Sequence, residues 1–215
     1  MKYLIVGLGN IGDEYADTRH NIGFTILDAL AAETETPFTD RRYGFLCEIK
    51  HRGRTLVLLK PTTYMNLSGN AVRYWMNKEK IPAGNLLIVV DDIALPLGSI
   101  RMRPKGSDGG HNGLANVSSV LGTSEYARIR VGIGNGFSKG AQVNYVLGKW
   151  TREERKFLDE RISIVKEMIK SFAFAGTELT MTTFNRQARL PSQAGPQRDE
   201  KSKGEELRNT DHDRT

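Results

Sequence analysis

The chain opens with Met1-Lys2-Tyr3-Leu4-Ile5-Val6-Gly7-Leu8-Gly9-Asn10-Ile11-Gly12, an apolar, β-rich run that passes directly into glycines. Such a run predicts a strand whose carboxyl end can face a ligand. The glycine spacing formally matches the dinucleotide-binding fingerprint. That fingerprint also needs a helix starting on the last glycine, so that the helix N-terminus holds the pyrophosphate. The polar, aperiodic stretch 13–19 follows instead and carries three carboxylates, so an ordinary strand–loop–helix turn is favoured.

Length and composition bound the rest of the molecule. The 215 residues, 39% of them hydrophobic, suffice for one well-packed domain and are few for two. The single cysteine, Cys47, and four scattered histidines offer neither a disulfide nor a zinc cluster, so a reducing compartment is expected. The chain starts without a signal-peptide pattern, and its longest apolar runs are too short to span a membrane, so we expect a cytoplasmic protein. The net charge of +6 favours polyanionic partners.

Strand and helix patterns alternate along the chain. Apolar periodicity predicts helices over 21–35, 67–78, 112–121 and 152–176, the last opened by a capping box at Thr151 and Glu154. β-type runs predict strands over 45–50, 55–60, 85–91, 98–104 and 127–134. This alternation predicts an α/β fold, a single-domain three-layer sandwich whose twisted, mixed but mostly parallel central sheet is flanked by helices. The domain is predicted over 1–185, followed by a polar disordered tail over 186–215.

Polar side chains gather in the loops that follow the predicted strands, where an α/β sheet binds its ligands. They are Asn10, His20, Asn21, Asn66, Asp92, His111 and Asn112. A carboxylate beside an imidazole fixes the tautomer of a general base for water, and His20 with Asp92 is the candidate pair. The alternatives are a local hydrogen bond for His20 at a helix start and a turn cap for Asp92.

Two further segments suit a ligand. Met65 and Asn66, within the stretch 61–69, fit an extended ligand because an amide satisfies a peptide group and methionine adapts to varied side chains; plain helix capping is the alternative. The glycine-rich loop 106–113 precedes a helix and suits an anion, or is a simple connector. Two basic stripes flank that loop and predict phosphate binding, one formed by Arg101, Arg103 and Lys105 and the other by Arg128 and Arg130.

Together these blocks resemble the bacterial-type peptidyl-tRNA hydrolase family over residues 1–185. The matching blocks are Val6-Gly7-Leu8-Gly9-Asn10 with Tyr15, Thr18-Arg19-His20-Asn21-Ile22-Gly23, Lys60 to Gly69, Asp91-Asp92 with Leu95-Pro96-Leu97-Gly98, Gly109 to Leu114, and Arg128 to Gly134. The resemblance implies hydrolysis of the ester between a peptide and the 3′ ribose of tRNA, which recycles tRNA from peptides released prematurely by ribosomes. It implies peptidyl-tRNA as partner, bound by its acceptor stem and 3′ end, and neither metal nor other cofactor. Because no feature of the sequence requires more than one copy, we expect a monomer.

The resemblance also implies roles for single residues. His20 would be the catalytic base oriented by Asp92, with Asn10 and Asn66 positioning the carbonyl and the attacking water. The implied substrate-binding residues are Tyr15, Asn21, Tyr64, Met65, Asn66, His111 and Asn112. Arg103 and Arg130 would grip the tRNA phosphate, with Lys105 and Arg128 as neighbouring candidates. Ile11 departs from the proline common in the family after Asn10.

Two other functions remain as alternatives. A catalytically silent RNA-binding relative would keep the basic cleft without needing an imidazole and carboxylate pair. A dinucleotide-dependent oxidoreductase would hold NAD or FAD at the glycines.

Overall fold

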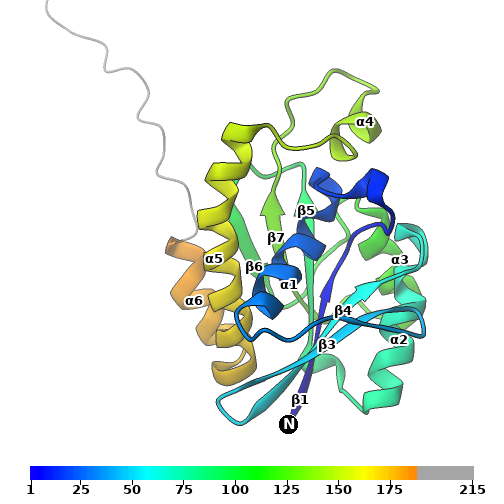
Figure 1. Ribbon diagram of the computed structural model, residues 1–215, viewed down its shortest axis with the longest axis vertical. Coiled ribbons are helices and arrows are strands. Elements are labelled where there is room, and N and C mark those ends of the chain that lie inside the picture. Colours follow the sequence, from blue (N-terminus) through cyan, green and yellow to red (C-terminus); the bar gives the residue numbers. More distant parts are fainter. Residues whose placement is uncertain (188–215) are drawn as a thin grey trace, which may run out of the picture.

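The computed structural model describes residues 1–187, which form a mixed sheet between two layers of helices (Figure 1). Its strands are β1 (Lys2–Gly7), β2 (Thr39–Arg41), β3 (Gly44–His51), β4 (Arg54–Pro61), β5 (Leu86–Asp92), β6 (Ile100–Arg103) and β7 (Ala127–Gly132). They lie in the order β2-β3-β4-β1-β5-β7-β6. The central strands β4, β1, β5 and β7 are parallel, whereas β2, β3 and β6 pair antiparallel at the two edges. The predicted three-layer α/β sandwich is confirmed.

Helices cover both faces of this sheet. They are α1 (Ile22–Ala32), α2 (Ser68–Glu79), α3 (Asn112–Leu121), α4 (Gln142–Val146), α5 (Arg152–Ala175) and α6 (Thr177–Gln187), with 3-10 turns η1 (Asp13–Tyr15), η2 (Arg19–Asn21), η3 (Met65–Leu67) and η4 (Ala83–Asn85). All four predicted helices are present within a few residues of their expected ends. β2 and α4 were not predicted, because elements of three and five residues carry little periodicity. The 11-residue α6 was also not predicted; its end falls in the polar stretch assigned to the tail. In the described part of the chain, no helix has the length and apolarity needed to cross a membrane.

The predicted tail begins at residue 186, but α6 continues to Gln187. Residues 188–215 lie outside the described part of the chain.

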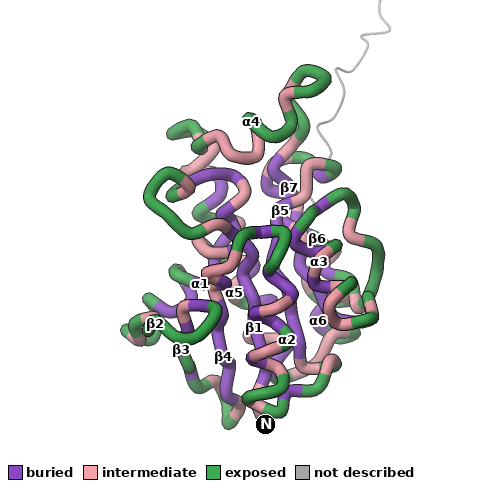
Figure 2. Tube along the Cα trace, turned by 90° about the vertical axis from the view of Figure 1, so that its right-hand side faces the viewer, coloured by how far each residue is buried: buried purple, intermediate pink, exposed green. Residues whose placement is uncertain are grey.

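Side chains of the central strands alternate between two cores. Tyr3 and Ile5 of β1 belong to the core under α1 and α5, and Leu4 and Val6 to the core under α2 and α3. The same alternation holds in β5, whose apolar residues are all buried, and Figure 2 shows these buried strands through the middle of the molecule. Two residues that are adjacent at a strand end therefore point to opposite faces of the sheet.

Gly7 and Gly23 allow α1 to approach the end of β1 very closely. A Cβ added to Gly7 would lie 2.3 Å from the Gly23 carbonyl oxygen, and one added to Gly23 would lie 2.5 Å from the carbonyl oxygen of Leu8. No side chain fits at either position without a backbone shift. This close packing holds η2, the turn before α1, over the carboxyl ends of the strands.

Candidate active site

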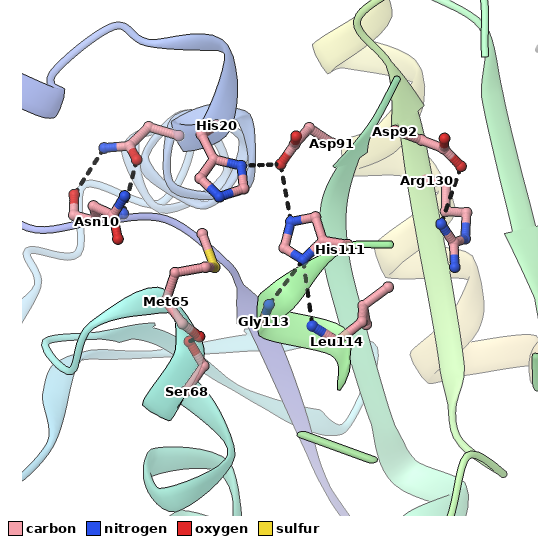
Figure 3. A network of polar contacts seen from close by, with 11 residues as sticks. Asn10, His20, Met65, Ser68, Asp91, Asp92, His111, Gly113, Leu114 and Arg130 are labelled. Atoms are coloured by element: carbon pink, nitrogen blue, oxygen red, sulfur yellow. Dashed lines mark hydrogen bonds and ion pairs between the residues drawn. The ribbon is translucent and has the colours of Figure 1, made fainter. Parts of the chain in front are cut away.

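Three polar side chains from distant parts of the sequence meet at the carboxyl ends of β1 and β5 (Figure 3). His20 lies on η2, Asp91 is the penultimate residue of β5, and His111 is the N-cap of α3. A pocket opens here, lined by His20, Asp91, Asp92, His111, Asn112 and Arg130. Gln142, Val143 and Val146 of α4 line its other side. The pocket lies where parallel α/β sheets bind their ligands.

The His20–Asp91 contact fixes the protonation of the imidazole. Nδ1 of His20 lies 2.9 Å from Oδ1 of Asp91, whose carboxylate is buried. Because an ionised carboxylate only accepts hydrogen bonds, Nδ1 carries the proton and Nε2 of neutral His20 has a free lone pair. Burial by itself would lower the pKa of His20, but the hydrogen bond and the charge of Asp91 outweigh it and raise the pKa. His20 is thereby suited to accept a proton near neutral pH.

The prediction that Asp92 orients His20 is wrong, because the partner is Asp91. Alternation along β5 places Asp91 on the face covered by α1, where η2 brings His20. Asp92 points to the opposite face and pairs with Nη1 of Arg130 on β7 at 3.1 Å. Its other carboxylate oxygen accepts from the backbone N–H of Ala94. Asp92 thus combines a turn cap with an ion pair.

His111 ties the start of α3 to the same carboxylate. Its Nδ1 accepts hydrogen bonds from the backbone N–H groups of Gly113 and Leu114, at 3.1 and 3.3 Å. A nitrogen that accepts is unprotonated, so Nε2 carries the hydrogen and donates it to Oδ1 of Asp91 at 3.1 Å. Burial alone would raise the pKa of Asp91, but the proximity of His111 and the hydrogen bonds from both histidines lower it well below its usual range. Asp91 is therefore held ionised between two donors.

The same three residues are the one group of potential metal ligands that the described residues bring together. In the observed geometry, protons on His20 Nδ1 and His111 Nε2 occupy the positions between the nitrogens and Asp91 Oδ1, and His111 Nδ1 is used by the α3 cap. A cation bound between them would have to displace both protons. The arrangement suits hydrogen bonding to Asp91 better than metal ligation.

Asn10 and Asn21 form a reciprocal clamp beside His20. The Asn21 side chain accepts from the Asn10 backbone N–H at 2.8 Å and donates to the Asn10 carbonyl at 2.9 Å. Asn21 is buried, and both ends of its amide are used in this way. It therefore positions Asn10, rather than offering its amide to a substrate as the resemblance implied. The side chain of Asn10 is half-buried and takes no part in this clamp, which uses only the Asn10 backbone (Figure 3).

The segment before α2 divides into a buried and an exposed part. Met65 is buried against Leu8 and α3, and its sulfur would lie 2.6 Å from a Cβ on Gly113. Tyr64 and Asn66 on either side are exposed, Tyr64 to 79%. The predicted substrate residues Tyr15 and Asn112 are half-buried and exposed, respectively. Asn112 lies in the pocket, whereas Tyr15 lies in η1 outside its lining.

The predicted basic stripes differ in accessibility. Arg103 is exposed on β6, and Lys105 is exposed with its ammonium 3.1 Å from Glu125. Arg130 is largely covered and donates to Asp92 and to the Ser107 carbonyl. Arg128 is fully buried and donates to backbone carbonyls around the glycine-rich loop, so it is excluded as a direct phosphate ligand.

Sequence reasoning missed the role of Arg19, which immediately precedes His20. Its buried guanidinium donates to the Lys149 carbonyl and to both carboxylate oxygens of Glu154. It also lies over the rings of Tyr145 and Trp150, 4.6 and 5.2 Å from their centroids. Arg19 therefore connects η2, the turn that contains His20, with α4 and with the start of α5. The only sequence signal was the capping box, which marks Glu154 as a helix-start residue.

The chain and its fold are similar to those of known proteins. The family model described as "Peptidyl-tRNA hydrolase" matches residues 4–192. The chain is 59% identical over 186 residues to a peptidyl-tRNA hydrolase of Phocaeicola vulgatus, covering 86% of this chain and all of that protein. It is 55% identical over 185 residues to the peptidyl-tRNA hydrolase of Porphyromonas gingivalis, again covering 86% and 100%. A crystal structure of peptidyl-tRNA hydrolase from Acinetobacter baumannii superposes with a TM-score of 0.80 at 34% identity, covering 85% of this chain and 94% of the other.

Proposed function

The chain belongs to the peptidyl-tRNA hydrolase family, and we propose that His20 is the general base with which it hydrolyses the ester between a peptide and the 3′ ribose of tRNA. The observation that carries this assignment is the hydrogen bond from His20 Nδ1 to Asp91. It leaves Nε2 unprotonated at the pocket, in a ring whose orientation is fixed. Hydrolysis returns the tRNA from abandoned peptidyl-tRNA to translation.

In this mechanism His20 transfers the protons, Asp91 stabilises its charged form, and neutral amides donate hydrogen bonds to the reacting groups. His20 Nε2 takes a proton from water as the water oxygen attacks the ester carbonyl, and Asp91 stabilises the resulting imidazolium. The amides of Asn10 and Asn66 orient the carbonyl and the water and donate to the developing oxyanion. Collapse of the tetrahedral intermediate breaks the bond to the ribose 3′ oxygen, and protonated His20 donates to that oxygen the proton that it took from water. The products are a free peptide acid and tRNA with a 3′ hydroxyl.

The substrate lies across the strand ends in this proposal. Arg103 faces solvent on the outermost strand, β6, and contacts the acceptor-stem phosphates, with Arg130 and Lys105 beside it. Asn112 and the exposed Asn66 bind the aminoacyl end, while His111 acts by holding Asp91 rather than by touching substrate. A monomer working in the cytoplasm without metal is the form that we propose.

The test is release of free tRNA from N-acetyl-aminoacyl-tRNA by the purified protein in the presence of EDTA. The wild-type protein should turn over under these conditions, and His20→Ala should not. Unchanged turnover by His20→Ala would remove the assigned base. Loss of wild-type activity in EDTA, restored by a divalent cation, would instead point to a metal held at His20, Asp91 and His111.

A catalytically silent RNA-binding protein is the second candidate, supported by the exposed arginines of β6. It predicts tRNA binding without release of the peptide. The orientation of the imidazole by a buried carboxylate favours the enzyme, because binding alone has no use for it.

A further inference from the structure

A cluster of cations stacked on aromatic rings lies toward the edge of the sheet formed by β2 and β3, whereas Arg103 lies on β6 at the other edge. The Arg42 guanidinium lies 5.1 Å from the ring centroid of Tyr43 and 5.3 Å from that of Tyr74. The Lys78 ammonium lies 5.7 Å from the Tyr74 ring and 4.6 Å from the Trp75 ring. We refer to Arg42, Tyr43, Tyr74, Trp75 and Lys78 as the Arg42 cluster.

The two cations of this cluster are available to a ligand. Arg42 and Lys78 are both exposed. Within residues 1–187 neither forms an ion pair with a carboxylate. The lysines and arginines that do form one are Lys2, Arg19, Lys60, Lys105, Arg130, Arg155, Lys166 and Lys170. A guanidinium held against rings has already lost much of its side-chain freedom, so contact with an anion costs less entropy.

The turn that presents Tyr43 has an unfavourable backbone. Tyr43 has φ of 66°, in the left-handed region that favours glycine or asparagine. Two hydrogen bonds hold this conformation: Trp75 Nε1 donates to the Arg42 carbonyl at 2.9 Å, and the Thr62 backbone N–H donates to the Tyr43 carbonyl at 3.0 Å. A strained residue held in place by its surroundings is a candidate for function.

The Arg42–Tyr43 turn lies at the same edge of the sheet as the catalytic pocket. Gly44 pairs with Pro61, so the Arg42–Tyr43 turn lies at the carboxyl end of β4, the same edge of the sheet as His20. Thr62, which bonds to Tyr43, is four residues from Asn66. Their Cα atoms are therefore separated by at most about 14 Å, a span that an extended peptide covers in about four residues.

The order of the strands indicates which part of the substrate reaches the Arg42 cluster. Arg103 lies on β6 at one edge, the pocket lies between β1 and β5, and the Arg42–Tyr43 turn lies toward the other edge. If the RNA lies over β7 and β6, the part of the substrate that extends past Asn66 toward β3 is the peptide. We propose, on the basis of the proposed function, that the Arg42 cluster binds the peptide of the substrate several residues from the ester and favours acidic and aromatic side chains there.

Matched substrates test this proposal. They are tRNAs carrying N-acetyl-alanine, or hexapeptides that differ only in the four residues farthest from the ester: acidic, neutral or lysine-containing. Wild type should show a kcat/KM at least about fivefold higher for the acidic than for the lysine-containing hexapeptide, mainly through KM, equivalent to roughly 1 kcal/mol of discrimination. Arg42→Glu combined with Lys78→Glu should reverse that order. N-acetyl-alanyl-tRNA is too short to reach the cluster and should be hydrolysed equally by both proteins.

Two further variants separate binding from folding. Arg52→Glu is the control, because Arg52 is also stacked on a ring, 5.0 Å from the Phe174 centroid, but lies in the β3–β4 turn at the opposite end of β3. It should leave the peptide preference unchanged. Tyr43→Gly removes the ring and suits the backbone, so it should keep or raise Tm while reducing the preference for the acidic hexapeptide.

Equal kcat/KM for all three hexapeptides in wild type would overturn the proposal. So would a loss with N-acetyl-alanyl-tRNA in the Arg42→Glu, Lys78→Glu protein as large as with the hexapeptides, since this would show that the cluster binds RNA. Neither result would affect the proposed function. That function fails separately, if wild type does not hydrolyse N-acetyl-alanyl-tRNA at all.

Discussion

Oδ1 of Asp91 accepts a hydrogen bond from Nδ1 of His20 at 2.9 Å, while the neighbouring carboxylate, Asp92, forms an ion pair with Arg130 on the other face of β5. The two aspartates are thus chemically alike and functionally separable. This offers an internal control for the proposed mechanism.

Asp91→Asn should lower kcat by roughly 10²- to 10⁴-fold, because the amide no longer enforces the reactive tautomer or stabilises the imidazolium. Asp92→Asn keeps the His20 contact and should cost much less. Single-turnover hydrolysis of N-acetyl-aminoacyl-tRNA measures both, and thermal unfolding confirms that both variants fold. A larger loss in Asp92→Asn than in Asp91→Asn would contradict the assignment.

The His20–Asp91 pair also sets the pH dependence. Only neutral His20 accepts a proton, so kcat/KM of wild type should fall with decreasing pH, with a midpoint above the ordinary histidine value of 6.5, because Asp91 raises the pKa. In Asp91→Asn the raising influence is lost while burial still lowers the pKa. Its residual activity should therefore persist to lower pH, with a midpoint below 6.5. Identical midpoints in the two proteins would show that the observed titration is not that of His20.

His111 allows its capping role to be separated from its contact with Asp91. His111→Asn retains a good N-cap but loses the Nε2 donor, whereas His111→Ala loses both. The alanine variant should be less stable than the asparagine variant by about 1 kcal/mol in urea unfolding. Both should lose activity to a similar degree, since Asp91 lacks its second donor in each. Full activity in His111→Asn would limit His111 to helix capping.

The sequence was sufficient to predict the fold and the position of His20 and His111 at the strand ends, and it failed where side-chain direction decides. The buried strand at 86–90 and the helices around it were predictable because apolar period and length are strong signals. Asp91 and Asp92 were not distinguishable, because β5 is buried on both faces and no polar alternation shows which carboxylate faces α1. Arg128 and Arg103 likewise look alike in the sequence, yet one is fully buried and the other exposed. The Arg19–Glu154 contact joins residues 135 positions apart, beyond the reach of any local pattern.

That contact should matter for stability and activity together. Glu154→Gln leaves the buried Arg19 guanidinium without its counter-charge and should destabilise the fold by about 3 kcal/mol in urea unfolding. It should also lower kcat, because Arg19 fixes the turn that carries His20. Glu153→Gln, one residue earlier and exposed, is the matched control and should change neither quantity. If Glu154→Gln lowered stability but left kcat intact, Arg19 would not position His20.

Substitution by alanine should affect tRNA binding at Arg103 and stability at Arg128. Arg103→Ala removes an exposed cation and should raise KM, leave kcat at saturation unchanged, and reduce the slope of log KM against log salt concentration by about one. Arg128→Ala removes donors to carbonyls of the glycine-rich loop and should lower Tm, because those carbonyls lose their partners. Arg52→Gln, at the far end of the sheet, should change neither salt slope nor KM. If Arg103→Ala keeps the wild-type slope while a variant of Arg130 or Lys105 reduces it, the phosphate contact belongs to that residue instead.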